Sequence, residues 1–313
     1  MKRREFTKLL SASSLSLMTG ASLFQISEEA SENDKLSVSI FSKHLQFLDY
    51  ENTGKMAKAL GFDGVDLTVR PKGHVLPENV KTDLPKAVEA IQKGGSICEM
   101  MTTNIEGVHN DLGVDILETA ADLGIKYYRT NWFKYPRNQS MPDALKVYQK
   151  QIKKLGNLNK KLGIIGNYQN HAGTKVGASY WEIDTLLKTV NTDYFGVQYD
   201  IRHAVAESGK AWSNGLQLLH SNIKIIVLKD FKWEIVEGKT KLVNVPIGEG
   251  MVDFDKYFKL LKKYGLNPPV SLHLEYGLDG AEKGKPTISV SENVVYDAMK
   301  KDLNKIQEMW AKA

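Results

Sequence analysis

The feature of this sequence that most constrains its fold is a regular alternation between short apolar runs and longer segments with helical periodicity. The apolar runs are rich in β-branched and aromatic residues, which is typical of buried strands. They lie at residues 36–41, 64–69, 96–102, 125–131, 164–170, 195–200, 223–230 and 269–276. The first two helical segments that follow them lie near 51–60 and after Asp83, the expected N-cap, with Pro85 in the first turn. The others lie at 114–123, 141–162, 181–190, 211–221, 253–265 and 293–312. Eight strand–helix units in succession predict an α/β fold, a single (β/α)8 TIM barrel.

The ends of the helical segments support this division of the chain. Several of them stop at a glycine just before the next strand, which is a common signal for a helix C-terminus. These glycines are Gly61, Gly124, Gly163 and Gly265. An open, doubly wound sheet is the alternative for such an alternation. No GxGxxG motif follows the first strand, which argues against the dinucleotide-binding form of that fold.

The first residues of the chain have the character of a targeting segment. A positive start is followed by a mildly apolar run from Leu9 to about Phe24 that is rich in serine and alanine. The order Arg3, Arg4, Phe6, Lys8 resembles the motif of a twin-arginine export signal. The run is too short and too polar for a stable membrane span, which needs about 20 apolar residues. An amphipathic N-terminal helix is the alternative interpretation.

We therefore expect residues 1–30 to be an export signal that is removed, and residues 31–313 to form the barrel of a periplasmic protein. The net charge of +5 comes from 42 basic and 37 acidic residues spread along the chain. Because no basic block stands out, we expect no nucleic-acid partner. The only cysteine, Cys98, lies in an apolar run, so the chain has no disulfide framework.

Polar residues gather where the predicted strands end. Six of the seven histidines lie at or just after such an end: His44, His74, His109, His171, His203 and His273. Other polar residues at these ends are Arg70, Arg129, Asn131, Gln169, Asn170, Asp200, Lys229, Asp230, Glu249 and Glu275. A single histidine at a strand end is usually structural. In a barrel, however, all carboxyl ends of the strands meet at one mouth, so these residues predict a shared polar site there.

Five motifs in order give the chain a family resemblance. NYQNH, QYDIRH, VLKD, GEGMVDF and LEY, about one strand–helix unit apart, resemble the xylose-isomerase-like barrel superfamily. That superfamily includes sugar and sugar-phosphate isomerases and epimerases, inosose dehydratase-like enzymes and endonuclease IV-like proteins. The stretch DLTVRPKGHVLPE, followed by MTTNI, looks like an exported subgroup of sugar isomerases or epimerases. The resemblance covers residues 36–312.

The resemblance implies a divalent metal site, from which this sequence departs. Family members hold the metal with Glu from the fifth strand, Asp from the sixth, His from the seventh and Glu from the eighth. Asp200 and Glu275 match this pattern, whereas Gln169 and Val227 stand at the other two positions. We expect Mn²⁺, Mg²⁺ or Zn²⁺ at Asp200, Glu275 and Gln169, where a histidine could replace the missing ligand. The alternative is a metal-free site in which both carboxylates bind sugar hydroxyls.

The expected reaction begins with removal of a proton from carbon beside a carbonyl, which needs a base and a positive charge near the developing enediolate. We assign catalysis to Glu275, His203, Lys229 and His171. We assign substrate binding to Arg70, His74, Arg129, Asn131, Asn170, Glu249, His273 and Trp233. The predicted ligand is an unphosphorylated sugar or keto-sugar. A 3-keto-glycoside lyase or hydratase and a non-catalytic sugar-binding barrel are the alternatives, and formation of a homo-oligomer is left open.

Overall fold

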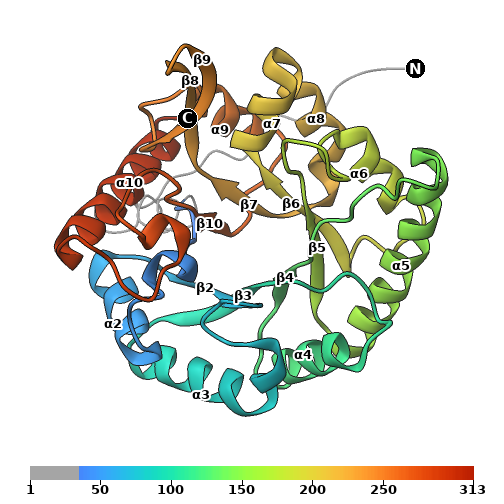
Figure 1. The fold of residues 1–313 in the computed structure, drawn as a ribbon, viewed down its shortest axis with the longest axis horizontal. Helices are drawn as coiled ribbons and strands as arrows, with labels where there is room; N and C mark the ends of the chain where they lie inside the picture. The colour runs from blue at the N-terminus through green and yellow to red at the C-terminus, as the bar shows by residue number, and fades with distance from the viewer. Residues whose placement is uncertain (1–34) are drawn as a thin grey trace, which may run out of the picture. The chain divides into compact units, whose positions relative to one another are not determined.

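The structure is a computed structural model that describes residues 35–313, in which eight parallel strands close into one barrel (Figure 1). Around the barrel the strands follow the order β1-β10-β7-β6-β5-β4-β3-β2. They are β1 (Val38–Phe41), β2 (Gly64–Val69), β3 (Ile97–Thr103), β4 (Tyr127–Arg129), β5 (Ile165–Gln169), β6 (Phe195–Asp200), β7 (Ile223–Leu228) and β10 (Val270–Leu272). The first and last strands pair in register, with Ile40 beside Leu272, which closes the sheet. The predicted (β/α)8 barrel is confirmed.

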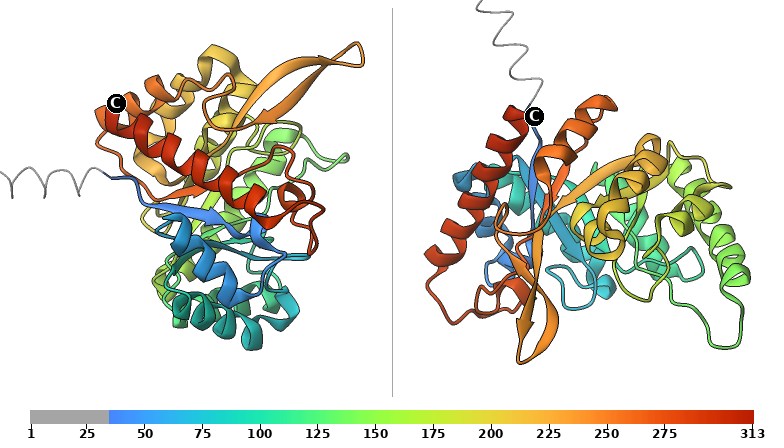
Figure 2. Two further views of the ribbon diagram at one scale, coloured as in Figure 1. Left: turned by 90° about the vertical axis from the view of Figure 1, so that its left-hand side faces the viewer. Right: turned by 90° about the horizontal axis from the view of Figure 1, so that it is seen from above.

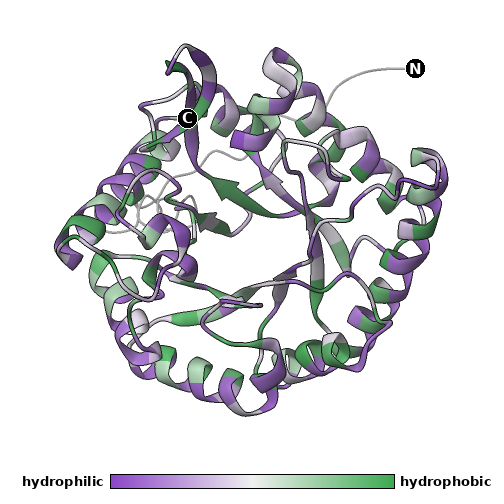
Figure 3. Ribbon diagram, in the orientation of Figure 1, coloured by the Kyte–Doolittle hydropathy of each residue, from purple (hydrophilic) through white to green (hydrophobic). Residues whose placement is uncertain are grey.

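Helices surround the barrel on its outer side (Figures 1 and 2). They are α2 (Tyr50–Leu60), α3 (Val80–Lys93), α4 (Asp111–Asp122), α5 (Met141–Leu162), α6 (Tyr180–Leu187), α7 (Ile201–Ser208), α8 (Trp212–Leu219), α9 (Phe254–Lys263) and α10 (Glu292–Lys312). Hydrophilic residues lie along these helices, whereas β7 and β10 are hydrophobic (Figure 3). The apolar faces of the helices and the strands therefore share one buried core.

The glycines predicted to end helices do so. Gly61 and Gly163 follow α2 and α5 with φ angles of 98° and 71°, in the left-handed region. A residue with a Cβ is strained there, so glycine lets the chain turn directly into the next strand. At the opposite ends, Asp49 and Ser140 accept hydrogen bonds from the first turns of the same two helices. Local sequence thus sets where these elements begin and end.

Two helical segments differ from their predicted bounds. Helix α3 begins at Val80, so Pro85 lies inside it and Asp83 is not its N-cap. The reason is packing, because the buried face of the helix already begins with Val80. After β6, the helix predicted near 211–221 is present as α8, and a further helix that was not predicted, α7, precedes it. Asp200 caps α7 through a 3.0 Å hydrogen bond from the backbone N–H of His203, so the helix starts directly at the strand end.

A β-hairpin that the sequence analysis did not predict follows β7. Strands β8 (Asp230–Val236) and β9 (Lys239–Val245) pair antiparallel and extend away from the barrel (Figure 2). The turn is formed by Glu237 and Gly238, both with positive φ. Two such residues at a hairpin turn match the twist of the flanking strands. The alternation of Phe231, Trp233 and Ile235 with polar residues is the pattern in the sequence that indicates the first strand of this hairpin.

The predicted export signal, residues 1–30, lies outside the described residues. Within residues 35–313, no helix combines the length and the apolar character that crossing a membrane requires. Cys98 is buried and makes no disulfide, in line with its place in an apolar run.

Candidate functional site

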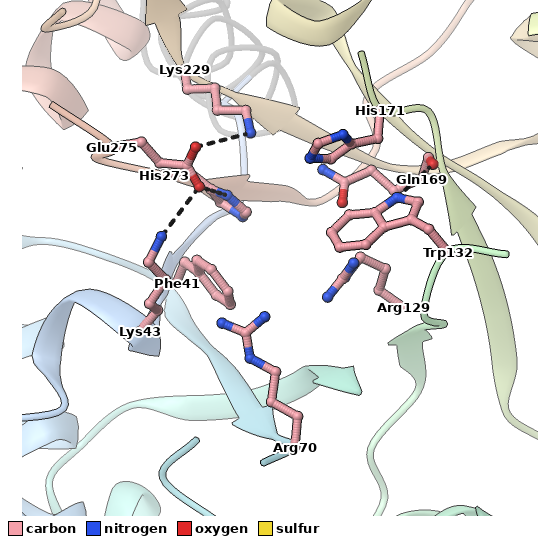
Figure 4. Close-up of a pocket in the computed structure, with 10 residues that line it drawn as sticks. All are labelled: Phe41, Lys43, Arg70, Arg129, Trp132, Gln169, His171, Lys229, His273 and Glu275. Atoms are coloured by element: carbon pink, nitrogen blue, oxygen red, sulfur yellow. Dashed lines mark hydrogen bonds and ion pairs between the residues drawn. The ribbon is translucent and has the colours of Figure 1, made fainter. Parts of the chain in front are cut away.

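A polar cavity of about 60 Å³ lies at the carboxyl ends of the barrel strands (Figure 4). The predicted residues that line it are Arg70, Arg129, Gln169, His171, Lys229, His273 and Glu275. Three further lining residues, not among the predicted site residues, are Phe41, Lys43 and Trp132. These side chains come from β1, β2, β4, β5, β7 and β10 or from the loops directly after them. The barrel thus brings together groups that are far apart in the sequence.

Lys229 lies at the centre of the charged part of this site. Its Nζ is 3.1 Å from Oδ2 of Asp200 and 3.4 Å from Oε2 of Glu275. It is also 2.9 Å from Nε2 of His203. Because the Lys229 side chain is only 4% exposed, these contacts hold its amino group in one position. The amino group therefore bridges the two carboxylates that the family pattern assigns to a metal.

Asp200 is completely buried and does not line the cavity. Oδ2 accepts a 2.8 Å hydrogen bond from Nε2 of Gln169, and Oδ1 accepts the cap hydrogen bond from His203. Every polar atom of the carboxylate is thus occupied by the protein. Asp200 fixes Lys229, Gln169 and the start of α7, and it lies behind Lys229 as seen from the cavity.

Glu275 is the carboxylate that lines the cavity. Its side chain is 25% exposed, and its Oε1 lies 3.3 Å from Nζ of Lys43 (Figure 4). Burial by itself would raise the pKa of Glu275. The nearby charges of Lys229 and Lys43, together with the adjacent His273 side chain, outweigh it and hold the pKa well below its usual value. Glu275 is therefore an ionised carboxylate at neutral pH. Its oxygens carry the lone pairs that a base needs, and its low pKa makes it a weak one.

His171 stands across the cavity from Glu275, beside Trp132 (Figure 4). Its Nδ1 lies 2.8 Å from the backbone carbonyl of Ala172. A carbonyl only accepts hydrogen bonds, so Nδ1 carries the proton and Nε2 keeps a lone pair. Burial and the charge of Lys229 lower the pKa of His171. The ring is thus a neutral imidazole, a second group able to accept a proton.

The expected divalent metal does not fit the side chains as they stand. Nζ of Lys229 contacts both carboxylates, and the amide nitrogen of Gln169 is directed at Asp200. Val227 is fully buried in β7 and offers no ligand atom. Among residues 35–313, no group of three or more His, Cys, Asp and Glu side chains is arranged to hold a metal ion.

A polar network continues from the cavity into the barrel. Nδ1 of His273 lies 3.8 Å from Oε1 of Glu275, and its Nε2 lies 3.1 Å from the hydroxyl oxygen of Ser271. The Ser271 hydroxyl donates a 2.6 Å hydrogen bond to Asp66, which also accepts one from Thr102. Asp66 is buried, and burial raises its pKa to about 6. Hydrogen bonds thus connect His273, which lies beside Glu275, to a second carboxyl group inside the barrel.

The base of the hairpin supports Glu275 from outside. The side-chain amide of Asn244, in β9, donates a 3.1 Å hydrogen bond to the backbone carbonyl of Glu275. Its oxygen accepts a 2.6 Å hydrogen bond from Arg202, which in turn lies 3.0 Å from Nδ1 of His203. The hairpin therefore connects the loop after β10 to α7.

The remaining predicted site residues do not line the cavity. His203 lies behind Lys229 and is 4% exposed. Asn170 exchanges hydrogen bonds with the backbone of Asp200, and Asn131 donates to Glu106. Three others lie elsewhere: His74 contacts Ser42, Glu249 pairs with Lys301 at the surface, and Trp233 is 48% exposed on the hairpin.

Two of the additional lining residues follow the first strand. Phe41 ends β1, and Lys43 belongs to the short 3-10 helix η1 (Ser42–Leu45). The strand-end argument that selected Arg70 and Lys229 applies equally to Lys43. Trp132 lies three residues beyond Arg129 and stacks on its guanidinium at 4.1 Å.

Comparisons with known proteins agree with this architecture. The family model described as "Xylose isomerase-like TIM barrel" matches residues 55–289. No curated protein matches the chain. Among solved structures, a xylose isomerase-like TIM barrel protein from Mycobacterium smegmatis, in complex with magnesium, has a TM-score of 0.63 at 13% identity, covering 88% of this chain and 98% of that one.

Two enzymes with the same fold are similar to a comparable degree. The 3-keto-D-glucoside 4-epimerase YcjR from E. coli has a TM-score of 0.63 at 12% identity, covering 87% of this chain and 100% of that one. A D-allulose 3-epimerase from Methylomonas sp. has a TM-score of 0.64 at 14% identity, covering 88% and 98%. At these identities the likeness concerns the fold, whereas the family model matches more than half of the sequence itself. The chain therefore belongs to the xylose isomerase-like TIM barrel family.

Proposed function

We propose that this protein is a carbohydrate isomerase or epimerase that removes a proton from carbon beside a carbonyl group. The observation that carries the proposal is the placement of Glu275 and His171 on opposite sides of one small cavity, with Lys229 and Lys43 next to the carboxylate. Epimerisation needs a proton removed from one face of a carbon and returned to the other. Two opposed groups suit that exchange.

In the proposed reaction, Glu275 accepts the proton on one face. Nε2 of His171 takes a proton from solvent and donates it to the carbon on the other face, and Glu275 then releases its proton to solvent. Removal of the proton leaves negative charge on the carbonyl oxygen, which must be stabilised for the reaction to proceed. The amino groups of Lys229 and Lys43, both beside Glu275, are placed to supply that positive charge. Lys229 takes this role where the family pattern places a metal.

A divalent metal at Asp200, Glu275 and Gln169 stays the alternative source of that charge. It would require Lys229 to leave its contact with both carboxylates. Dialysis against a chelator, followed by activity and metal measurements, separates the two possibilities. Activity that survives with no bound metal supports Lys229, and activity that returns only with added Mn²⁺, Mg²⁺ or Zn²⁺ supports the metal.

The test of the proposal is solvent exchange in D₂O, followed by NMR with a panel of ketoses and 3-keto-glycosides. We expect deuterium at the carbon beside the carbonyl and formation of the epimer. In Glu275→Gln and His171→Asn, interconversion should fall by about 100-fold or more, because each loses one proton-transferring group. Each variant should still exchange the epimer that the remaining group deprotonates.

The controls for this test are Glu118→Gln and His220→Asn, two substitutions of the same kind outside the cavity. They should leave both rates unchanged. Absence of exchange with every sugar, or rates in Glu275→Gln equal to those of the controls, would contradict the proposal.

Two other functions share this site. A lyase or hydratase acting on a 3-keto-glycoside would begin with the same proton removal and would release a group in place of forming an epimer, which product analysis detects. A sugar-binding barrel without catalysis is favoured by Gln169 and Val227, the two lost ligand positions. Sugar binding without any exchange would identify the binder.

Export to the periplasm stays a prediction that rests on the N-terminal sequence. Cell fractionation compares the natural chain with Arg3→Lys, Arg4→Lys, which removes the twin-arginine pair. Retention of the variant in the cytoplasm, with export of the natural chain, is the expected result.

A further inference from the structure

The part of the cavity opposite Glu275 holds two guanidinium groups with no acceptor. Arg70 and Arg129 point into the same space (Figure 4). Arg129 is only 4% exposed, and its Nη1 is buried without any hydrogen-bond partner. Within residues 35–313, neither guanidinium makes a salt bridge or a side-chain hydrogen bond. Burying a guanidinium without an acceptor is unfavourable, so the structure leaves binding capacity unused here.

Nearby aromatic and acidic groups offset this charge only in part. Trp132 covers one face of Arg129 at 4.1 Å, which leaves the N–H groups at the edge of the guanidinium free. Asp66 lies close enough to act on both arginines through its charge, but its oxygens are already used by Ser271 and Thr102. Arg129, which lines the cavity, thus keeps N–H groups that have no acceptor among residues 35–313.

The charges that line the cavity are unequal. Lys43, Arg70, Arg129 and Lys229 face it, whereas Glu275 is the one acidic side chain that residues 35–313 contribute to its lining. Glu275 is paired with both lysines, and Asp200, buried beside the cavity, balances the second of these charges through its contact with Lys229. The positive charge in excess is therefore that of the two arginines.

A second pocket, of about 640 Å³, adjoins the cavity at Arg70. Its charged lining residues are Arg70, Lys72, Lys283 and Lys285, and the described part of the chain places no acidic residue in its lining. Lys283 is partly neutralised by Glu282, at 3.5 Å. The outer approach to the cavity thus has the same sign of charge as its arginine side, which attracts anions toward it.

We infer that the substrate is a sugar acid whose carboxylate is bound by Arg129 and Arg70. This inference rests on the proposed function and names the substrate class for the same site. A guanidinium matches a carboxylate with two parallel hydrogen bonds, and the planar carboxylate fits a cavity of about 60 Å³. In so small a space, the carboxylate and the reacting carbon belong to the same sugar unit.

The test compares affinities within pairs that differ in the acid group, by titration calorimetry at low ionic strength. The pairs are D-glucuronate with D-glucose, D-galacturonate with D-galactose, and D-gluconate with D-glucitol. We expect at least one acid to bind about 10-fold or more tightly than its neutral partner, the gain of a charged hydrogen-bonded pair. Added salt should reduce this preference.

Two variants locate the binding site. Arg129→Met removes the buried charge but keeps an apolar side chain against Trp132, and Arg70→Gln changes a residue that is more exposed. Both should lose the preference for the acid, and Lys153→Gln, an exposed change on α5, should keep it. Without ligand, Arg129→Met should melt at the same or a higher temperature than the natural protein, because an unpaired buried charge is gone.

Three results would overturn the inference. The first is equal affinity within every pair, or no binding by any acid. The second is tighter binding of D-glucose 6-phosphate than of every acid, and the third is an acid preference that survives in both arginine variants. These measurements need no turnover, so they are independent of the proposed reaction. Exchange of neutral keto-sugars without acid preference would leave the proposed function standing alone. Acid binding without exchange would support the sugar-acid site and would contradict the proposed reaction.

Discussion

At the scale of single residues, Asp66 makes the stability of the barrel depend on pH. Its pKa is raised by burial from 3.8 to about 6. Because the folded pKa lies above the unfolded one, this group's contribution to stability is complete below pH 3.8 and is lost as the pH rises through 6. In Asp66→Asn this dependence disappears. The free energy of unfolding of the variant, relative to the natural protein, should therefore rise by about 2 kcal/mol between pH 4.5 and 7.5.

Urea unfolding of both proteins at several pH values measures this difference. A difference that stays constant over the range would show that Asp66 titrates alike in the folded and unfolded chains. The prediction concerns the slope alone, because the substitution also changes the hydrogen bond from Ser271.

At the same scale, the sequence predicts which residues lie at the mouth of the barrel. It does not predict which side chains they contact there. Arg70, Lys229 and Glu275 could be assigned because any residue that follows a barrel strand reaches that end. The pairing of Lys229 with both carboxylates could not be predicted, because it depends on the side-chain conformations of three separate strands. Glu249 shows the limit clearly, because Asp230 holds its loop through the N–H groups of Gly248 and Gly250. Its side chain pairs at the surface with Lys301 of α10, 52 residues away.

At the scale of elements, Asp230 fixes the loop that joins the hairpin to α9. Its two carboxylate oxygens accept four backbone hydrogen bonds, from Phe231, Gly248, Gly250 and Val252. Asp230→Asn replaces one acceptor with a donor that faces backbone N–H groups. We expect a loss of about 2–4 kcal/mol in the free energy of unfolding, measured by urea denaturation.

The exposed substitution Asp122→Asn on α4 serves as the control for this element and should cost less than about 0.5 kcal/mol. Equal effects of the two substitutions would contradict the role assigned to Asp230.

The hairpin was not predicted from the sequence because residues 223–230 were assigned to one strand. In the structure, β7 ends at Leu228 and β8 begins at Asp230. The sequence pattern typical of a strand therefore extends past the point where the chain changes direction.

At the scale of the whole molecule, α10 completes the ring of helices next to the point where β1 meets β10. Trp310 is 2% exposed and packs edge-on against Phe258 of α9, with ring centroids 5.5 Å apart. Trp310→Ala leaves a cavity between the two helices and should cost about 3–5 kcal/mol, measured by chemical denaturation. The matched change Trp181→Ala, at a side chain 62% exposed, should cost far less. Similar costs would mean that α10 contributes little to the barrel.

The whole fold was the most predictable level, for a physical reason. Each strand–helix unit carries its own local signals, and a right-handed crossover between parallel strands leaves few ways to arrange eight of them. Long-range contacts were not needed to recognise the barrel. They were needed to recognise that Asp200 is buried behind Lys229 and that Trp233 lies on a hairpin outside the cavity.

The most direct test of this account measures deuterium incorporation into a keto-sugar by chelator-treated protein, for the natural chain and for Lys229→Met. Exchange should persist without a metal in the natural chain and fall by about 100-fold or more in the variant. Exchange that requires an added divalent metal, and that proceeds equally well in Lys229→Met, would contradict it.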